Sequence, residues 1–138
     1  MAETLPAGWT LASAVCSDGS DPSAIQLNPG ETVTVVFTNT LSRGQIIVEK
    51  QTDPDGSTQS FVFTASYGSP FSLTDGGSND SGPLLPGTYS VAETLPAGWT
   101  LTSAVCSDGS DPAAIQLAPG ETVTVVFTNT LQRGVIIV

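Results

Sequence analysis

Histidine is absent from the 138-residue chain, lysine and arginine together number only three, and there are two cysteines. A zinc site or a histidine-based catalytic triad therefore cannot be assembled, because the side chains that either one needs are missing. With 13 acidic residues and a net charge of −10, the surface repels phosphate backbones, so no nucleic-acid partner is expected. No apolar run approaches the roughly 18 residues of a membrane span. The first residues, MAETLPAG, lack the basic and apolar parts of a signal peptide.

Internal repetition is the dominant feature of the sequence. Residues 3–48 return at 93–138 with only five substitutions, whereas residues 49–92 occur once. The chain is therefore expected to hold about one and a half copies of a unit some ninety residues long. Because the pattern begins and ends inside a unit, we expect a segment of a longer tandem array.

The domain organisation follows from the phase of the repeat. One complete unit is predicted at 44–131, preceded by an orphan second half at 3–43 and followed by a first-strand stub at 134–138. The orphan half and residues 93–131 compete for the single first half, 44–92. Local completion closes the shorter connection, whereas exchange between chains is a domain swap that would propagate into a filament. The stub can likewise add a strand to the edge of another molecule.

Strand signals are dense, and no segment has a helical period. The chain contains 14 glycines and 10 prolines, and Pro-Gly corners separate short β-branched or aromatic runs. Three segments have the composition of loops: 53–57, 75–83 and 107–112. The expected fold class is all-β, an antiparallel β-sandwich. The predicted strands span residues 45–51, 60–65, 88–93, 99–106 and 121–130.

Three predicted strands carry a polar residue at the end of their core-facing side. Since side chains alternate along a strand, Lys50 shares a face with apolar residues of the first strand. Glu93 does the same in a middle strand and Asn129 in the last, and Lys50 is the only lysine in the chain. Leaving an amine, a carboxyl and a carboxamide unpaired in an apolar core would cost several kcal/mol, so we expect them to hydrogen-bond or to react.

If these three groups are buried, a reaction between them is predicted. Burial lowers the pKa of a lysine and raises that of a glutamate, so both are expected to be neutral at pH 7. A neutral Lys50 is a nucleophile, and a protonated Glu93 polarises the Asn129 carbonyl and carries the proton to departing ammonia. The product is an amide between Lys50 and Asn129, formed once per molecule. The alternative is a solvated strand end at which the three side chains never meet.

Three motifs carry a resemblance to a known family. They read GQIIVEK at 44–50, LPGTYSVAETLPAGW at 85–99 and ETVTVVFTNT at 121–130. Their order and spacing resemble the Cna-protein B-type, or prealbumin-like, domain of bacterial surface adhesins and pilins, in its tandem-repeat form. The resemblance implies a prealbumin-like or immunoglobulin-like sandwich and an intramolecular isopeptide bond. The roles it implies are nucleophile, catalytic acid/base and acceptor for Lys50, Glu93 and Asn129.

Two further pairs of polar residues are weaker candidates. Glu3 and Asn39 are the equivalents of the acid and the acceptor in the orphan half, which has no lysine strand of its own. Asp53 and Asp55 lie in an acidic loop whose oxygens would suit calcium. Turn formation alone also explains the composition of that loop.

One tryptophan and one cysteine occur in each copy of the second half. Trp9 and Trp99 would suit a carbohydrate-stacking surface, and packing in the core or at a sheet edge is the alternative. Cys16 and Cys106 occupy equivalent positions. They are expected either to bond between units or chains or to remain free thiols.

The predicted function is that of a structural stalk or fibre module in an extracellular bacterial surface protein. Its expected partners are neighbouring repeat units or other copies of the chain. We expect no cofactor and no multiple-turnover reaction, because the only reactive groups consume themselves. The alternatives are a self-assembling filament subunit with swapped half-units and a calcium- or glycan-binding module.

Overall fold

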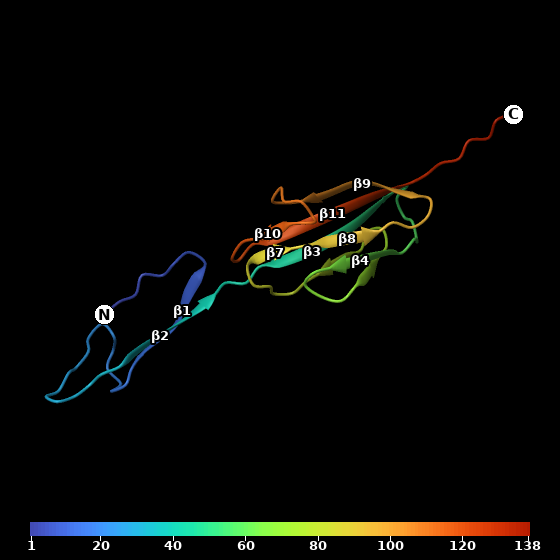
Figure 1. Ribbon diagram of the computed structural model, residues 1–138. Helices are drawn as coiled ribbons and strands as arrows, with labels where there is room; N and C mark the ends of the chain where they lie inside the picture. Colours follow the sequence, from blue (N-terminus) through green and yellow to red (C-terminus); the bar gives the residue numbers. More distant parts are fainter. The chain divides into compact units, whose positions relative to one another are not determined.

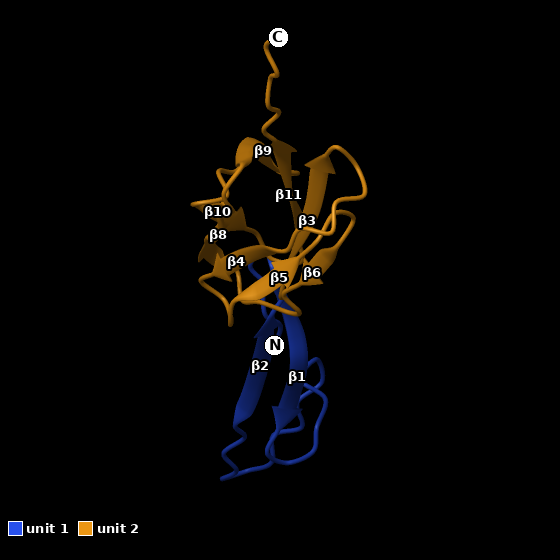
Figure 2. Cartoon of the chain, turned by 90° about the vertical axis from the view of Figure 1, so that its right-hand side faces the viewer, with its two compact units in different colours: residues 1–42 blue, residues 43–138 orange.

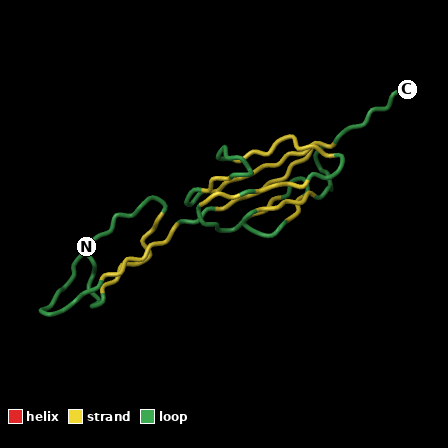
Figure 3. Tube along the Cα trace, in the orientation of Figure 1, coloured by secondary structure: helices red, strands yellow, loops and turns green.

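The computed structural model describes all 138 residues as two compact units, residues 1–42 and 43–138 (Figures 1 and 2). All of the regular structure is β-strand (Figure 3), which confirms the predicted all-β fold class. The structure contains no helix that is long and apolar enough to cross a membrane.

The first layer of the larger unit is a four-stranded sheet with the order β6-β3-β11-β9. It consists of β3 (Gln45–Asp53), β6 (Ser78–Asp80), β9 (Trp99–Cys106) and β11 (Thr122–Leu131). Strand β11 pairs antiparallel with β9 and parallel with β3, and β3 pairs antiparallel with β6. The long closing strand therefore lies between two neighbours and is hydrogen-bonded along both edges (Figure 1).

The second layer is built around β4 (Phe61–Ala65). This strand pairs antiparallel with β5 (Phe71–Leu73) on one side and with β8 (Val91–Thr94) on the other. One residue before β8, β7 (Gly87–Tyr89) pairs with β10 (Ile115–Leu117). In Figure 2 these strands and the four-stranded sheet enclose one interior, which confirms the sandwich.

Aromatic side chains join the two layers across the core. The ring of Phe61 meets Trp99 edge-on with centroids 5.1 Å apart, and Phe63 meets Phe127 in the same way at 5.1 Å. Every second residue of β3 from position 46 to position 52 is buried, which is the period of two predicted for this strand. The buried apolar residues are Ile46, Val48, Phe61, Phe63, Leu73, Val91, Trp99, Cys106, Ile115, Leu117, Val123, Val125 and Phe127.

Several pairings differ from the sequence-based prediction. Residues 75–83, predicted as a loop, contain β6, whose backbone pairs with β3. The strand predicted at 88–93 is interrupted, because β7 and β8 pair with different neighbours, β10 and β4. Strands β3 and β11 run parallel within an otherwise antiparallel structure. In each case the hydrogen-bonding partner is distant in sequence, so no local pattern marks the pairing.

The smaller unit consists of two antiparallel strands, β1 (Trp9–Cys16) and β2 (Val35–Leu41). Strand β2 is shorter than its counterpart β11, although residues 32–41 and 122–131 both read TVTVVFTNTL. The first residues of β11 are paired with β3, and nothing in the smaller unit replaces β3. The strand length therefore depends on the partner rather than on the local sequence.

Identical residues are buried in one unit and exposed in the other. Trp99 is 6% exposed and Leu117 is 4% exposed, whereas their counterparts Trp9 and Leu27 are 40% and 68% exposed. The smaller unit lacks the second layer that covers these side chains in the larger one. Residues 134–138 form no strand, and their apolar side chains are also exposed.

We expect Leu117→Ala to lower the free energy of unfolding of the larger unit by about 2–5 kcal/mol, because it leaves a cavity in a packed core. The matched substitution Leu27→Ala should change it by less than about 0.5 kcal/mol, because that side chain is exposed. Urea denaturation followed by near-ultraviolet circular dichroism measures both values. Equal losses in the two variants would contradict the difference in packing.

Candidate functional site

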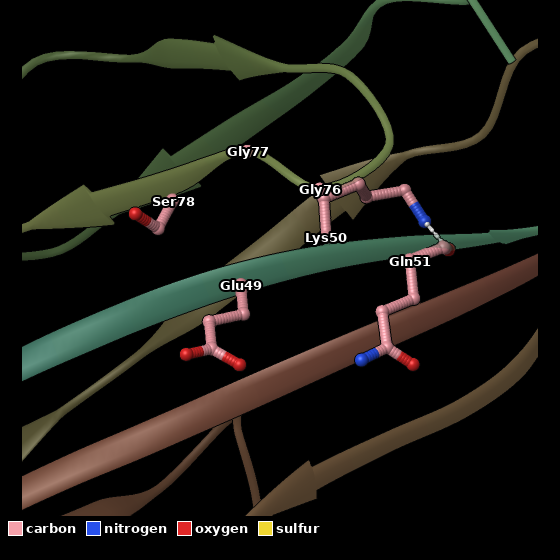
Figure 4. Close-up of a pocket in the computed structure, with 6 residues that line it drawn as sticks. All are labelled: Glu49, Lys50, Gln51, Gly76, Gly77 and Ser78. Carbon is pink, nitrogen blue, oxygen red and sulfur yellow. Dashed lines mark hydrogen bonds between the residues drawn. The ribbon is translucent and has the colours of Figure 1, made fainter. Parts of the chain in front are cut away.

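Lys50 lies on the inward face of β3 and is only 1% exposed. Its Nζ donates hydrogen bonds to the backbone oxygens of Gln51 at 2.7 Å and Phe127 at 3.2 Å, and Figure 4 draws the first of them. The same nitrogen lies 4.2 Å from the centre of the Phe61 ring. On this side of the core the amine therefore contacts uncharged backbone oxygens and an aromatic ring.

The backbone of Lys50 is covered by the segment that precedes β6. Its N–H donates to Gly77 O at 3.0 Å, and Gly76 N–H donates to Lys50 O at 2.9 Å. A small open pocket of about 260 Å³ lies here, next to β3 (Figure 4). It is lined by Glu49, Lys50, Gln51, Gly76, Gly77 and Ser78.

Glu93 approaches the amine from the opposite layer, on β8. Its Oε1 lies 3.7 Å from Lys50 Nζ and accepts a hydrogen bond from Asn129 Nδ2 at 2.7 Å. The side chains of Lys50 and Glu93 are 0% and 2% exposed, and Asn129 is 0% exposed. A single carboxyl oxygen thus contacts both the amine and the carboxamide, out of contact with solvent.

The parallel register of β3 and β11 produces this convergence. Lys50 is paired with Phe127, and Asn129 lies two residues further along the same strand. Positions 127 and 129 share the inward face of β11 because side chains alternate along a strand. The first and last strands of the larger unit therefore present the amine and the carboxamide to the same part of the core.

Two polar atoms of this cluster have no hydrogen-bond partner: Asn129 Oδ1 and Glu93 Oε2. Each buried polar atom without a partner costs about 1–3 kcal/mol. A buried polar network that is only partly satisfied is less favourable than an apolar core. The cluster is therefore energetically costly, and a reaction that removed one of its polar groups would relieve part of that cost.

Burial opposes the charged form of both titratable members. Desolvation lowers the pKa of the Lys50 amine, and the nearby carboxylates of Glu93 and Asp75 oppose this shift only in part. Desolvation also raises the pKa of Glu93, although Lys50 and Asn129 favour its ionised form. The two pKa values shift toward each other, which favours a neutral amine beside a neutral carboxyl.

The structure brings together the three side chains that the sequence singled out, Lys50, Glu93 and Asn129. They meet inside the core and not at a solvated strand end. Their assignment as nucleophile, acid/base and acceptor stays a prediction, because proximity and burial do not by themselves establish a reaction.

The sequence analysis did not identify Asp75, whose negative charge influences the pKa of Lys50. Its carboxylate accepts hydrogen bonds from the backbone N–H groups of Thr52 at 2.8 Å and Gly56 at 2.7 Å. These bonds lower the pKa of Asp75, and the resulting negative charge opposes the lowering of the Lys50 pKa. The partners lie 23 and 19 residues away in sequence, so no local signal could have identified this residue.

The smaller unit repeats part of the cluster. Asn39 Nδ2 donates a hydrogen bond to Glu3 Oε1 at 2.6 Å, as Asn129 does to Glu93 in the larger unit. Asn39 Oδ1 has no hydrogen-bond partner, which is also true of Asn129 Oδ1. The acid and the carboxamide are therefore paired in the orphan half without a lysine beside them.

The remaining candidates are placed as follows. Asp53 and Asp55 are exposed, and no group of three or more His, Cys, Asp and Glu side chains gathers to hold a metal ion. Cys16 and Cys106 are both buried and free, and burial raises the pKa of Cys106 to about 11. Trp99 packs against the core ring of Phe61.

Comparison with known protein families assigns the chain to one of them. Residues 46–136, well over half of it, match the family described as the prealbumin-like fold domain. The chain therefore belongs to the prealbumin-like fold domain family, as its resemblance to Cna-protein B-type domains predicted. No curated protein sequence matches the chain.

Two solved structures of bacterial proteins align with the chain, and the first of them has a similar fold. The major pilin protein T-13 of Streptococcus pyogenes aligns with a TM-score of 0.53 and 18% identity over 75% of this chain and 51% of the pilin. An adhesin from Mobiluncus mulieris, which contains intramolecular disulfide, isopeptide and ester bond cross-links, aligns with a TM-score of 0.46 and 18% identity over 83% of this chain and 50% of the adhesin. The chain spans about half the length of each, and likeness to the pilin at this identity shows the fold alone.

Glu93 is expected to make the stability of the larger unit depend on pH. Its pKa is raised in the folded state, so its protonated form stabilises the fold below the ordinary glutamate pKa, and this contribution is lost as pH rises through the folded-state value. The Lys50→Met variant isolates the effect, because it has neither the lysine charge nor the amine that could react.

Urea denaturation of Lys50→Met between pH 4 and pH 8 should show this loss of stability as pH rises. Adding Glu93→Gln should remove that component, because glutamine does not titrate. The difference between the two variants cancels the contributions of the other carboxylates. A difference that does not change with pH would show that Glu93 titrates as an ordinary surface glutamate.

Proposed function

We propose that this chain is a structural module of a bacterial surface stalk or fibre, made rigid by an isopeptide bond between Lys50 and Asn129. The observation that carries the proposal is the position of Glu93 Oε1, 3.7 Å from Lys50 Nζ and 2.7 Å from Asn129 Nδ2. Membership of the prealbumin-like family and a fold like that of a pilin support a role at the cell surface. The proposed location is extracellular.

The bond forms by attack of Lys50 Nζ on the side-chain carbonyl carbon of Asn129. A new C–N bond forms, Nδ2 leaves as ammonia, and the atoms balance without water, an oxidant or a cofactor. The nucleophile has to be the neutral amine, which the lowered pKa of Lys50 favours. Because both partners are consumed, the reaction occurs once and the protein is not an enzyme that turns over.

Glu93 acts as the proton carrier. A half-turn of the Asn129 amide places Oδ1 where Nδ2 now lies, 2.7 Å from Glu93 Oε1. The protonated carboxyl then donates to this oxygen and stabilises the negative charge that develops on it during attack. It subsequently accepts the proton of the attacking amine and delivers it to the departing nitrogen. The raised pKa of Glu93 favours the protonated form that begins this sequence.

Burial supplies the driving force for this reaction. An amine and a carboxamide, both costly to keep in the core, are replaced by one neutral amide, and the ammonia escapes to solvent. The reaction also removes the need to satisfy the charge of the lysine within the sandwich. The same residues in water would have no reason to react, which is why the folded core is required.

The position of the bond suits a load-bearing module. It joins β3 to β11, so tension that enters at the first strand and leaves by the last passes across the bond and not through the 79 residue steps between positions 50 and 129. Treated as a cross-link that closes a loop of this length, it stabilises the unit by about 4.5 kcal/mol through the unfolded state. Unlike a disulfide, an amide is not reduced by thiols.

Intact-mass measurement of the denatured protein tests the proposal. The unaltered chain is expected to weigh one ammonia less than its sequence predicts. Lys50→Ala, Glu93→Ala and Asn129→Ala should each restore the full calculated mass, because each removes the amine, the acid or the acceptor. The Lys50→Ala variant should also lose about 4.5 kcal/mol of stability together with the cross-link.

Asn39→Ala is the matched control, because it removes the equivalent carboxamide of the smaller unit. This variant should still lose one ammonia. Tandem mass spectrometry of a digest should then locate a peptide in which Lys50 is joined to Asn129. A full calculated mass for the folded, unaltered chain would remove the isopeptide proposal.

A further inference from the structure

Strand β3 loses its backbone partner on one edge at the position that carries Lys50. Strand β6 pairs with the first part of β3, and its register continues for one more position, where Lys50 N–H donates to Gly77 O at 3.0 Å (Figure 4). The chain turns at Gly76, whose φ of 79° glycine adopts readily, and Gly77 N–H donates to Thr74 O at 2.9 Å. Beyond Lys50, this edge of β3 therefore has no strand beside it.

The carboxylate of Asp75 takes the place of the missing strand. The register of β6 with β3, extended to residue 75, sets Asp75 opposite Thr52. Its Oδ1 accepts the hydrogen bond of Thr52 N–H at 2.8 Å, which a paired strand would accept with a backbone oxygen. Its Oδ2 accepts a second bond from Gly56 N–H at 2.7 Å. One side chain thus binds both the end of β3 and the loop that follows it.

The opposite edge of this strand end is bound by β11. Lys50 is paired there with Phe127, and the pairing continues to the last residue of β3. The side chain of Thr52 is buried, and its hydroxyl donates to Pro54 O at 2.9 Å. The end of β3 is therefore held on one edge by a strand and on the other by the side chain of Asp75.

The direction of the Lys50 side chain depends on this segment. Its Nζ donates to the backbone oxygen of Gln51 at 2.7 Å, and Gln51 lies between Lys50 and Thr52. A shift of the backbone at Thr52 would move that oxygen and, with it, the amine. Reacting groups have to be held in a near-attack arrangement, and a misplacement of about 1 Å can slow a reaction by about 100-fold.

We propose that Asp75 is a positioning residue for the reaction of Lys50 with Asn129. Its carboxylate binds the end of β3 on the edge that β6 leaves open and holds the amine in the cluster with Glu93 and Asn129. The inference rests on the proposed function, because it concerns the rate of that reaction. Asp75 forms no covalent bond and transfers no proton.

The charge of Asp75 gives this role a second measurable effect. Desolvation lowers the pKa of the Lys50 amine, and Glu93 on β8 and Asp75 are the charged side chains that raise it. Strand β11 has no charged residue, and Asp53 and Asp55 are exposed. Removing the charge of Asp75 therefore lowers the pKa of Lys50 further, so the neutral amine becomes available at lower pH.

The rate of ammonia loss tests the inference. Full-length chains made by chemical synthesis and kept in acidic urea are unfolded, so they start with the full calculated mass. Dilution into buffer starts folding, which tryptophan fluorescence follows, and samples quenched in acid are weighed at intervals. At a pH where the unaltered chain reacts more slowly than it folds, Asp75→Ala should lose ammonia at least about tenfold more slowly, because one edge of β3 is no longer held.

Asp75→Asn separates the position of the strand from the charge. The amide oxygen can still accept the Thr52 N–H, so this variant should react faster than Asp75→Ala. The charge is gone, so the rate should begin to rise at a lower pH than in the unaltered chain. The loss of a purely structural contact would not move the pH profile.

Asp80→Asn is the matched control. Asp80 lies on β6, and its Oδ1 also accepts a backbone hydrogen bond, from Gly82 N–H at 2.8 Å, but it is not among the groups that shift the pKa of Lys50. This variant should keep the rate and the pH profile of the unaltered chain.

Three results would overturn the positioning role. They are an Asp75→Ala chain that folds and reacts as fast as the unaltered chain, an Asp75→Asn profile at the unaltered pH, and a control that shifts as far as Asp75→Asn. If Asp75→Ala does not fold, the pH profile of Asp75→Asn decides alone.

The unaltered chain separates this inference from the proposed function. If it folds without losing ammonia, the proposed function fails, and the positioning role fails with it. If it loses one ammonia while the Asp75 variants behave like Asp80→Asn, only the positioning role fails.

Discussion

The parallel pairing of β3 with β11 is the constraint on which the candidate site depends. It places the first and last strands of the larger unit side by side, with Lys50 beside Phe127 and Asn129 two residues further along. The second layer then covers both side chains, and Glu93 meets them from that layer. An antiparallel arrangement of the same two strands would reverse one of them and carry its polar end to the other end of the sandwich.

The stability cost of the buried polar groups at this site is linked to the proposed function. A core with a buried amine, a buried carboxyl and two polar atoms without partners is less stable than an apolar core of the same shape. The lowered pKa of Lys50 and the raised pKa of Glu93 reflect the same cost, because burial disfavours the charged form of each group. Under the proposed reaction the cost is temporary, since it favours formation of an amide that stabilises the unit afterwards.

The two copies of the second half show that the burial of a residue depends on its tertiary surroundings and not on the local sequence alone. In the larger unit Leu117 is 4% exposed, and in the smaller unit its counterpart Leu27 is 68% exposed. The Glu–Asn pair forms in both, because both residues lie within the repeated segment. The lysine belongs to the other half, so the complete cluster needs two halves to meet. Near-identical repeats carry a risk of exchanging halves, and a covalent bond within each unit would prevent it.

The sequence by itself determined the strands with strong alternation, including Trp99–Cys106, and the inward direction of Lys50, Glu93 and Asn129, because alternation is a local property. It also determined the repeat and hence the equivalence of Glu3 and Asn39. Only the tertiary structure decided the parallel register, the short strand β6 and the position of Asp75. These depend on hydrogen bonds between residues far apart in the chain. For the same reason, only the tertiary structure brought the three polar side chains to one carboxyl oxygen.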